Sequence, residues 1–182
     1  MTKTNIYRLK GGSGATTIAC AMALTSPRPV VLGAATLNEY EDLAACLGLP
    51  NGDGDDAYVN DKVTMRLIAD ADAFDDSNID LIMSTDAAIA GWDNILVTRL
   101  CYLALRKAVA ATAVLPTSII VIKEPMRALD VKDAERCVSR PAIAIVNLDP
   151  AVARSIDAGL LSARMPSSLR GPIERLHIKE TV

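Results

Sequence analysis

The sequence predicts an α/β domain in which a mostly parallel sheet is flanked by helices. Two observations carry this prediction. Apolar runs of strand length alternate with helical segments at least five times along the chain, which is typical of a parallel sheet covered on both faces. Aromatic residues make up only 3% of the 182 residues, so the core must be built from Ala, Val, Leu and Ile. Such a core suits helices packed on parallel strands better than an antiparallel sandwich.

The strands are predicted from short apolar runs bounded by polar or turn residues. In chain order, the predicted strands are Asn5–Leu9, Pro29–Ala34, Ile79–Ser84, Ser118–Lys123 and Pro141–Leu148. The right-handed crossovers between such strands place the strand-to-helix loops along one edge of the sheet, where ligands usually bind.

The helices are predicted from apolar residues at helical spacing and from their end signals. Gly-Leu-Pro ends the second helix, and Asp149 followed by Pro150 begins the fifth. In chain order, the predicted helices are Ala15–Leu24, Glu39–Leu49, Trp92–Ala110, Arg127–Val138, Pro150–Leu161 and Ser168–Leu176. Asn51–Asp56 is predicted as a loop, and 57–78 is ambiguous, with part of 63–74 expected to be helical.

The longest periodic segment is Trp92–Ala110, for which a helix is the firmest expectation. Its large apolar residues would form a core face, with an interface between chains as the alternative. These residues are Trp92, Leu96, Leu100, Leu103 and Leu105. With 51% hydrophobic residues and no low-complexity linker, one domain over residues 1–182 is expected.

Several classes of protein are excluded by composition. No run approaches 18 uninterrupted apolar residues, and the N-terminus is too polar for a secretory signal, so we expect a cytoplasmic protein with no membrane span. His177 has no Cys or His neighbour, which argues against a zinc site. The cysteines form no C-x-x-C pair and are expected to be buried free thiols. They are Cys20, Cys46, Cys101 and Cys137.

The charge is distributed unevenly along the chain. Residues 1–98 hold 6 Lys/Arg against 14 Asp/Glu, and residues 99–182 hold 13 against 8. One interpretation is an ordinary solvated surface with an acidic loop region. The other is a basic face that contacts nucleic acid or an acidic partner.

A glycine-rich stretch, "LKGGSGATTIA" (Leu9–Ala19), lies between the first predicted strand and the first helix. In that context the backbone N–H groups form an anion-binding nest at the positive end of the helix. Gly11, Gly12 and Gly14 would let the chain approach a phosphate. The alternative is that the glycines only form a tight turn, since Ala15 breaks the full pattern G-x-x-x-x-G-K-[ST].

The eight residues "KGGSGATT" (Lys10–Thr17) resemble the deviant Walker A motif K-G-G-x-G-K-[ST]-[ST] of the ParA/MinD family of P-loop ATPases. The resemblance implies that Lys10 is the signature lysine, which reaches across a dimer to the partner's nucleotide. It also implies that Thr16 ligates magnesium, that Thr17 caps the helix or touches the α-phosphate, and that Asn147 lies near the adenine. The implied nucleotide-binding set is Lys10, Gly11, Gly12, Ser13, Gly14, Ala15, Thr16, Thr17 and Asn147.

The sequence differs from the family pattern at the residues that carry out ATP hydrolysis. Ala15 replaces the Walker lysine, and Gly33 and Ala35 stand where the family has the two aspartates of D-x-D. Ser84 stands where Walker B ends in Asp, with Asp86 two residues on. Phosphoryl transfer depends on these charges and on a positioned water, so slow or absent ATP hydrolysis is expected, with no catalytic residue assigned.

A naturally degenerate member is the favoured interpretation, because a single engineered Lys→Ala change would leave the other positions as Asp. Binding of ATP with Mg²⁺ stays open, since the nest, Lys10 and Thr16 remain. Asp80, Asp86 and Asp93 are expected to be surface or capping carboxylates and not metal ligands.

The resemblance implies two functions. The first is a ParA-like partition or positioning protein for plasmid, phage or chromosome DNA. Such a protein forms a homodimer, binds DNA through a basic face and is released by a ParB-like partner protein. The alternative is a pseudo-ATPase, a regulatory or interaction scaffold that pairs with a ParA-like homologue and does not bind DNA. Candidates for the basic face are Arg127, Lys132, Arg136, Arg140, Arg154, Arg164 and Arg170; ordinary solvated charges are the competing explanation for them.

Overall fold

Eight strands form one sheet in the computed structural model, which describes residues 1–50, 52, 54–71, 73–111 and 114–179. They are β1 (Lys3–Tyr7), β2 (Val30–Ala34), β3 (Ala57–Tyr58), β4 (Val63–Leu67), β5 (Asp80–Thr85), β6 (Asp93–Arg99), β7 (Ser118–Lys123) and β8 (Ala142–Asn147). Their order is β3-β4-β2-β5-β1-β6-β7-β8. Every pair is parallel except β3 and β4, which confirms the predicted fold class.

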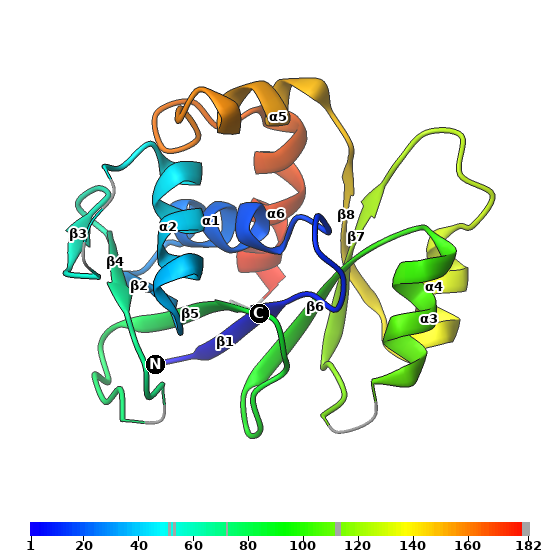
Figure 1. Ribbon diagram of the computed structural model, residues 1–182, viewed down its shortest axis with the longest axis horizontal. Coiled ribbons are helices and arrows are strands. Elements are labelled where there is room, and N and C mark those ends of the chain that lie inside the picture. The colour runs from blue at the N-terminus through cyan, green and yellow to red at the C-terminus, as the bar shows by residue number, and fades with distance from the viewer. Residues whose placement is uncertain (51, 53, 72, 112–113, 180–182) are drawn as a thin grey trace.

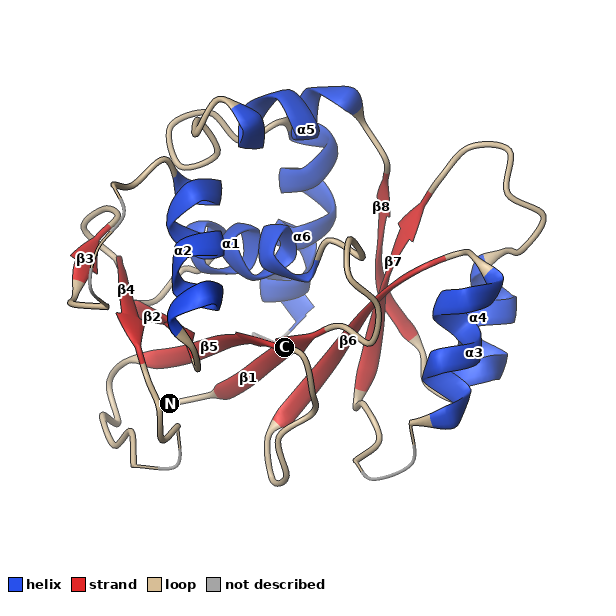
Figure 2. Ribbon diagram, viewed as in Figure 1, coloured by secondary structure: helices blue, strands red, loops and turns tan. Residues whose placement is uncertain are grey.

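Six helices cover this sheet, and Figure 1 shows how they divide between its two faces. They are α1 (Ala15–Thr25), α2 (Leu37–Leu47), α3 (Tyr102–Ala110), α4 (Val131–Val138), α5 (Pro150–Asp157) and α6 (Ser167–Lys179). Helices α1, α2, α5 and α6 gather on one side, and α3 and α4 lie together on the other (Figure 2). None of the helices in the described ranges is long and apolar enough to cross a membrane.

Three helices begin at the caps that their sequences provide. Thr36 and Glu39 form a capping box at α2, and Asp130 and Asp133 form one at α4. The Asp149 side chain accepts a hydrogen bond from the backbone N–H of Ala151, ahead of a proline in the first turn of α5. These local signals fix where the helices start relative to the strand ends.

The buried apolar residues form three clusters. The largest lies between the sheet and α1, α2 and α6, and a second lies between β1, β6 and β7 and the helices α3 and α4. The third lies on the same side as α3 and α4 but under β2 and β5, where segments between strands cover the sheet. Its buried members are Val31, Ile68, Leu81, Met83 and Trp92.

The predicted helix Trp92–Ala110 is wrong over its first half. Its residues form β6, the buried strand between β1 and β7, and only Tyr102–Ala110 form a helix. Ile95, Leu96 and Val97 are all at most 3% exposed, because the sheet is covered on both faces at this position. A strand buried on both faces lacks the alternating pattern that separates a strand from a buried helix.

The segment 63–74 also differs from the helix expected for part of it. Val63–Leu67 form β4, which pairs with β2 in parallel, and β3 adds a short antiparallel edge. The other predicted elements are confirmed with shifted ends; α4 starts at Val131, four residues after the expected Arg127. Two residues of the predicted loop Asn51–Asp56, Asn51 and Asp53, lie outside the described residues.

The expectation of buried free thiols holds for two of the four cysteines. Cys20 and Cys46 are buried between α1 and α2, whereas Cys101 is half-buried and Cys137 is exposed. Burial raises the pKa of the Cys20 thiol, and a hydrogen bond with Cys20 lowers the pKa of Cys46. The prediction is wrong for Cys137, which lies on the solvent side of the short helix α4.

Candidate functional site at the carboxyl edge of the sheet

The glycine-rich loop joins the end of β1, near the middle of the sheet, to the start of α1. Gly12 and Gly14 have φ angles of 72° and 93°, a left-handed region that residues with a Cβ rarely adopt. The Ser13 hydroxyl donates to the Lys10 carbonyl oxygen at 2.7 Å, and the Gly14 carbonyl accepts the first helical hydrogen bond, from the Ile18 N–H. The loop is therefore a closed turn that presents backbone N–H groups at the positive end of α1.

A cavity of about 170 Å³ lies against one side of this loop. Four residues of the predicted nucleotide set line it together: Ser13, Gly14, Thr17 and Asn147. The rest of its wall is mainly apolar and comes from β7, β8, α5 and α6, through residues such as Ile122, Val146, Val152, Ile156 and Leu169. This places a mostly apolar hollow beside a nest for anions, the combination that a nucleotide base and its phosphates require.

Asp149 brings a negative charge to the mouth of the same cavity. The Ser168 hydroxyl donates to Asp149 Oδ2 at 2.6 Å and the Ala151 N–H donates to Oδ1 at 2.8 Å. These hydrogen bonds lower the pKa of Asp149. Its carboxylate is thus held at the start of α5 by partners from α5 and α6, in the wall of the cavity that Ser13 and Gly14 also line.

The other members of the predicted set do not line this cavity. The Lys10 ammonium donates to the Gly11 carbonyl at 3.4 Å on the exposed side of the loop. Ala15, at the Walker lysine position, is 1% exposed and belongs to the largest core cluster. Position 15, where the family pattern has a lysine, therefore carries a small side chain that packs in the core.

Thr16 has a partner that no sequence pattern indicates. Arg8 Nη1 donates to Thr16 Oγ1 over 3.4 Å, and Arg8 Nε lies 2.8 Å from Asp86 Oδ1. The Arg8 side chain is only 19% exposed, whereas that of Asp86 is 70% exposed. Arg8 thus links the first turn of α1 to the segment after β5.

A second missed group lies where β6 and β7 end. Arg99 lines the cavity, and its Nη1 is 3.2 Å from Glu124 Oε1, while Arg127 pairs with Oε2 of the same carboxylate. The pairing of Arg99 with Glu124 is ionic and not a hydrogen bond, because Arg99 Nε and Glu124 Oε1 are buried without a hydrogen-bond partner among the described residues. The sequence predicts a helix over Trp92–Ala110, which places Arg99 in the middle of a helix. The prediction therefore misses Arg99 as a residue at the end of a strand, where site residues lie.

The three positions where the family pattern has aspartate differ in their surroundings: Gly33 and Ser84 are buried, and Ala35 is exposed. A Cβ on Gly33 would lie 2.3 Å from Met83 Sδ and 3.0 Å from Ile68 Cδ1, so a side chain there cannot be accommodated without movement. Ala35 is exposed, and Ser84 is 2% exposed within β5. The described residues contain no group of three or more His, Cys, Asp or Glu side chains that could hold a metal ion.

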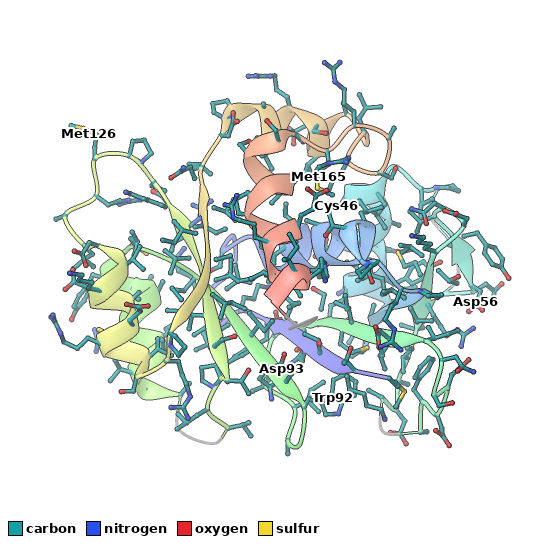
Figure 3. The ribbon with its side chains drawn as sticks, turned by 180° about the vertical axis from the view of Figure 1, so that it is seen from behind. Cys46, Asp56, Trp92, Asp93, Met126 and Met165 are labelled. Atoms are coloured by element: carbon teal, nitrogen blue, oxygen red, sulfur yellow. The ribbon has the colours of Figure 1, made fainter. Side chains whose placement is uncertain are left out.

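The three carboxylates expected to be structural have structural partners. Asp80 Oδ1 accepts from the Thr2 N–H at 2.7 Å and Oδ2 lies 3.5 Å from Arg28 Nε. Asp93, labelled in Figure 3, accepts from the Thr117 hydroxyl. Asp86 pairs with Arg8, as described above.

The seven predicted basic residues are divided between the two sides of the sheet. Arg127, Lys132, Arg136 and Arg140 come from α4 and its flanking loops, and Arg154, Arg164 and Arg170 come from α5, α6 and the loop between them. Arg136 pairs with Asp133 and Arg170 with Glu174, which partly neutralises them. Arg154 and Arg164 share the wall of one cavity of about 530 Å³.

Three solved structures with this architecture are distant from the chain in sequence. The cell division ATPase MinD of Pyrococcus furiosus matches with a TM-score of 0.78 and 14% identity over 100% of this chain and 99% of its own. MinD of Pyrococcus horikoshii, complexed with Mg-ADP, matches at 0.73 and 15% over 98% and 95%. A ParA family ATPase from Chlorobium tepidum matches at 0.70 and 14% over 97% and 98%.

No protein-family model and no curated protein matches the chain by sequence. The resemblance first seen in Lys10–Thr17 is confirmed at the level of the fold, since the matches cover nearly the whole chain. The chain therefore has the ParA/MinD-type P-loop fold.

Proposed function

We propose that the chain is a ParA-like partition or positioning protein that binds ATP and hydrolyses it slowly or not at all. The observation that carries the proposal is the closed glycine loop beside the cavity lined by Thr17 and Asn147. The fold supports it, since neighbours with this architecture include a cell division ATPase and a putative plasmid partition protein of Borrelia burgdorferi. The loss of hydrolysis rests on Ala15, Gly33 and Ser84, which supply no charge to a γ-phosphate or to an attacking water.

ATP binding without turnover is the first expected result. Calorimetry with ATP gives saturable binding to the native chain, and phosphate release stays at the background rate. Gly14→Ala weakens binding, because a Cβ at φ 93° distorts the nest. Gly91→Ala is the matched control, since Gly91 also has a positive φ of 79° and its added Cβ meets nothing within 4 Å.

An Ala15→Lys variant tests the assignment of the hydrolytic loss. We expect no turnover from this change alone, because Gly33 and Ser84 still leave the attacking water without a carboxylate. Turnover restored by Ala15→Lys would show that position 15 alone silences the site, and would contradict the part of the proposal that concerns Gly33.

The proposal extends to a dimer in the cytoplasm that acts with a partner protein, with Lys10 available on the exposed side of the loop to reach a second chain. In this proposal the chain segregates or positions DNA through non-specific binding. A second candidate, a pseudo-ATPase scaffold without DNA binding, is favoured by the division of the basic residues and by their ion pairs.

A gel shift with non-specific duplex DNA at two salt concentrations separates the two candidates. The DNA-binding proposal predicts a shift that weakens steeply with salt, with a slope that falls by about one for each phosphate contact removed. Arg154→Ala with Arg164→Ala removes two neighbouring cations, and Lys132→Ala with Arg136→Ala is the matched pair on the other side. Absence of a shift at low salt would leave the scaffold candidate.

A further inference from the structure

A magnesium ion accompanies the nucleotide in one solved structure with this fold, the Pyrococcus horikoshii MinD complexed with Mg-ADP. A P-loop metal shell in this chain would have to draw on Thr16, Ser84 and Asp86. Thr16 Oγ1 already accepts a hydrogen bond from Arg8, and Ser84 offers a buried hydroxyl in place of a carboxylate. Asp86, the carboxylate two residues after Ser84, is paired with Arg8. The residues present therefore do not fit a magnesium ion.

Arg8 lies between the groups that would hold the metal. One nitrogen of its guanidinium contacts the Thr16 hydroxyl and another contacts the Asp86 carboxylate, so a single side chain joins the first turn of α1 to the segment after β5. A guanidinium is always protonated and cannot donate an electron pair to a metal. A dication brought to Thr16 would meet this fixed positive charge at hydrogen-bond range.

The same geometry gives Arg8 a further capacity. Its side chain follows β1 directly, and the Arg8 N–H donates to the Thr85 carbonyl at 3.3 Å, so the backbone is held in register with β5. The side chain reaches the start of α1, where the loop N–H groups favour an anion. A planar guanidinium can bind phosphate oxygens through two parallel N–H groups, which an ammonium cannot do.

We propose that Arg8 takes the place of the magnesium ion and of the missing cation at position 15, so that the site binds nucleotide phosphates without metal. The proposal rests on the nucleotide site proposed above and concerns its chemistry. Arg8 is thus a binding residue, and Asp86 tunes it by neutralising part of its charge.

The test is calorimetric titration of ATP into the full chain, once with excess Mg²⁺ and once with EDTA. We expect ATP to bind at least as tightly in EDTA as with excess Mg²⁺, because ATP chelates Mg²⁺ in solution and the metal then competes with Arg8 for the phosphate oxygens. Arg8→Ala raises the dissociation constant in EDTA by about tenfold or more, the loss typical of a charged hydrogen bond. In this variant, magnesium strengthens ATP binding, because Thr16 and Asp86 are released.

Two further variants separate this role from a structural one. Arg28→Ala is the matched control, because Arg28 also pairs with a carboxylate, Asp80, but near the amino ends of the strands. It leaves ATP affinity unchanged. Asp86→Asn frees the charge of Arg8 and tightens ATP binding in EDTA, a gain that loss of a structural ion pair would not produce, and it keeps the test decisive if Arg8→Ala does not fold.

The outcomes distinguish this inference from the proposed function. ATP binding that requires Mg²⁺ in the native chain would overturn the role of Arg8 and leave the nucleotide site in place. Loss of affinity in Asp86→Asn would also overturn it. No binding in either buffer would overturn both the role of Arg8 and the nucleotide site.

Discussion

Replacing Gly33 by Asp destabilises the protein by about 4 kcal/mol or more, although aspartate is the residue that the family pattern has at this position. The new Cβ would lie 2.3 Å from Met83 Sδ, and the carboxylate would enter the apolar cluster formed with Ile68 and Leu81. Overpacking and an unpaired buried charge add together. Urea unfolding followed by circular dichroism measures the change.

Two comparisons make the result specific. Gly171→Asp is the matched control, because its added Cβ lies 3.8 Å from Arg175 Nη1 on the surface of α6, and its stability stays within about 0.5 kcal/mol of the native chain. Met83→Ala combined with Gly33→Asp is less destabilising than the two single changes added together, because it removes the overlapping sulfur. An additive pair would show that Met83 does not exclude the side chain.

The second large effect is expected at Asn94, where replacement by Asp costs about 3 kcal/mol. Asn94 is 2% exposed; its Nδ2 donates to the carbonyls of Ile89 and Trp92, and its Oδ1 accepts from Asn5 and from the Ile89 N–H. The substitution is nearly isosteric, but it replaces the NH₂ group, which donates to two carbonyl oxygens, by a carboxylate oxygen. That oxygen repels both carbonyl oxygens. Urea unfolding of both proteins measures the difference.

The pH dependence of this variant provides a check with a definite sign. Burial and the facing carbonyls hold the pKa of the carboxyl introduced at position 94 above its unfolded value, so the folded chain binds the extra proton first. The stability deficit therefore shrinks as the pH falls through that folded pKa. Asn78→Asp, at an exposed position, serves as the control and stays within about 0.5 kcal/mol at neutral pH. A deficit that does not change with pH would contradict the assigned network.

The strand, loop and helix around Lys10–Thr17 could be predicted from the sequence because their signals are local. A strand of five residues, glycines with positive φ and a helix of small residues are each specified by neighbouring residues. The capped starts of α2, α4 and α5 are local in the same sense. Such signals sufficed for the fold class, which the distant structures confirm, but not for β3, β4 and β6.

The parts that could not be predicted depend on contacts between distant segments. The sequence of β6 resembles that of a buried helix because β6 is covered on both faces and pairs with β1 and β7, which are distant in the sequence, so its apolar residues do not alternate with polar ones. The pairing of Arg8 with Asp86 joins residues 78 positions apart, and the overlap at Gly33 involves Met83 on a neighbouring strand. The charged and packed groups around the glycine loop come from segments that are distant in the sequence. The motif therefore indicates where the site lies, and the order of the strands determines which charged residues surround it.

The exposed Met126 is another feature that no sequence pattern indicates. It lies in the loop between β7 and α4, which extends away from the sheet in Figure 3, and it adopts a φ of 62°. Its side chain is fully exposed, although a hydrophobic side chain is usually expected to be buried.

The central place of β1 has a consequence for synthesis of the chain. β1 pairs with β5 and β6, and β2 pairs with β4 and β5, so the first strand made has no neighbour until Asp80–Arg99 have left the ribosome. During that interval β2 and β4 can already pair with each other, whereas β1, which precedes the glycine loop, has no strand to pair with. Parallel pairing over such separations is slow, because loop-closure entropy is lost before the contacts form. The nascent chain therefore exposes both edges of β1 to chaperones for about half of its translation.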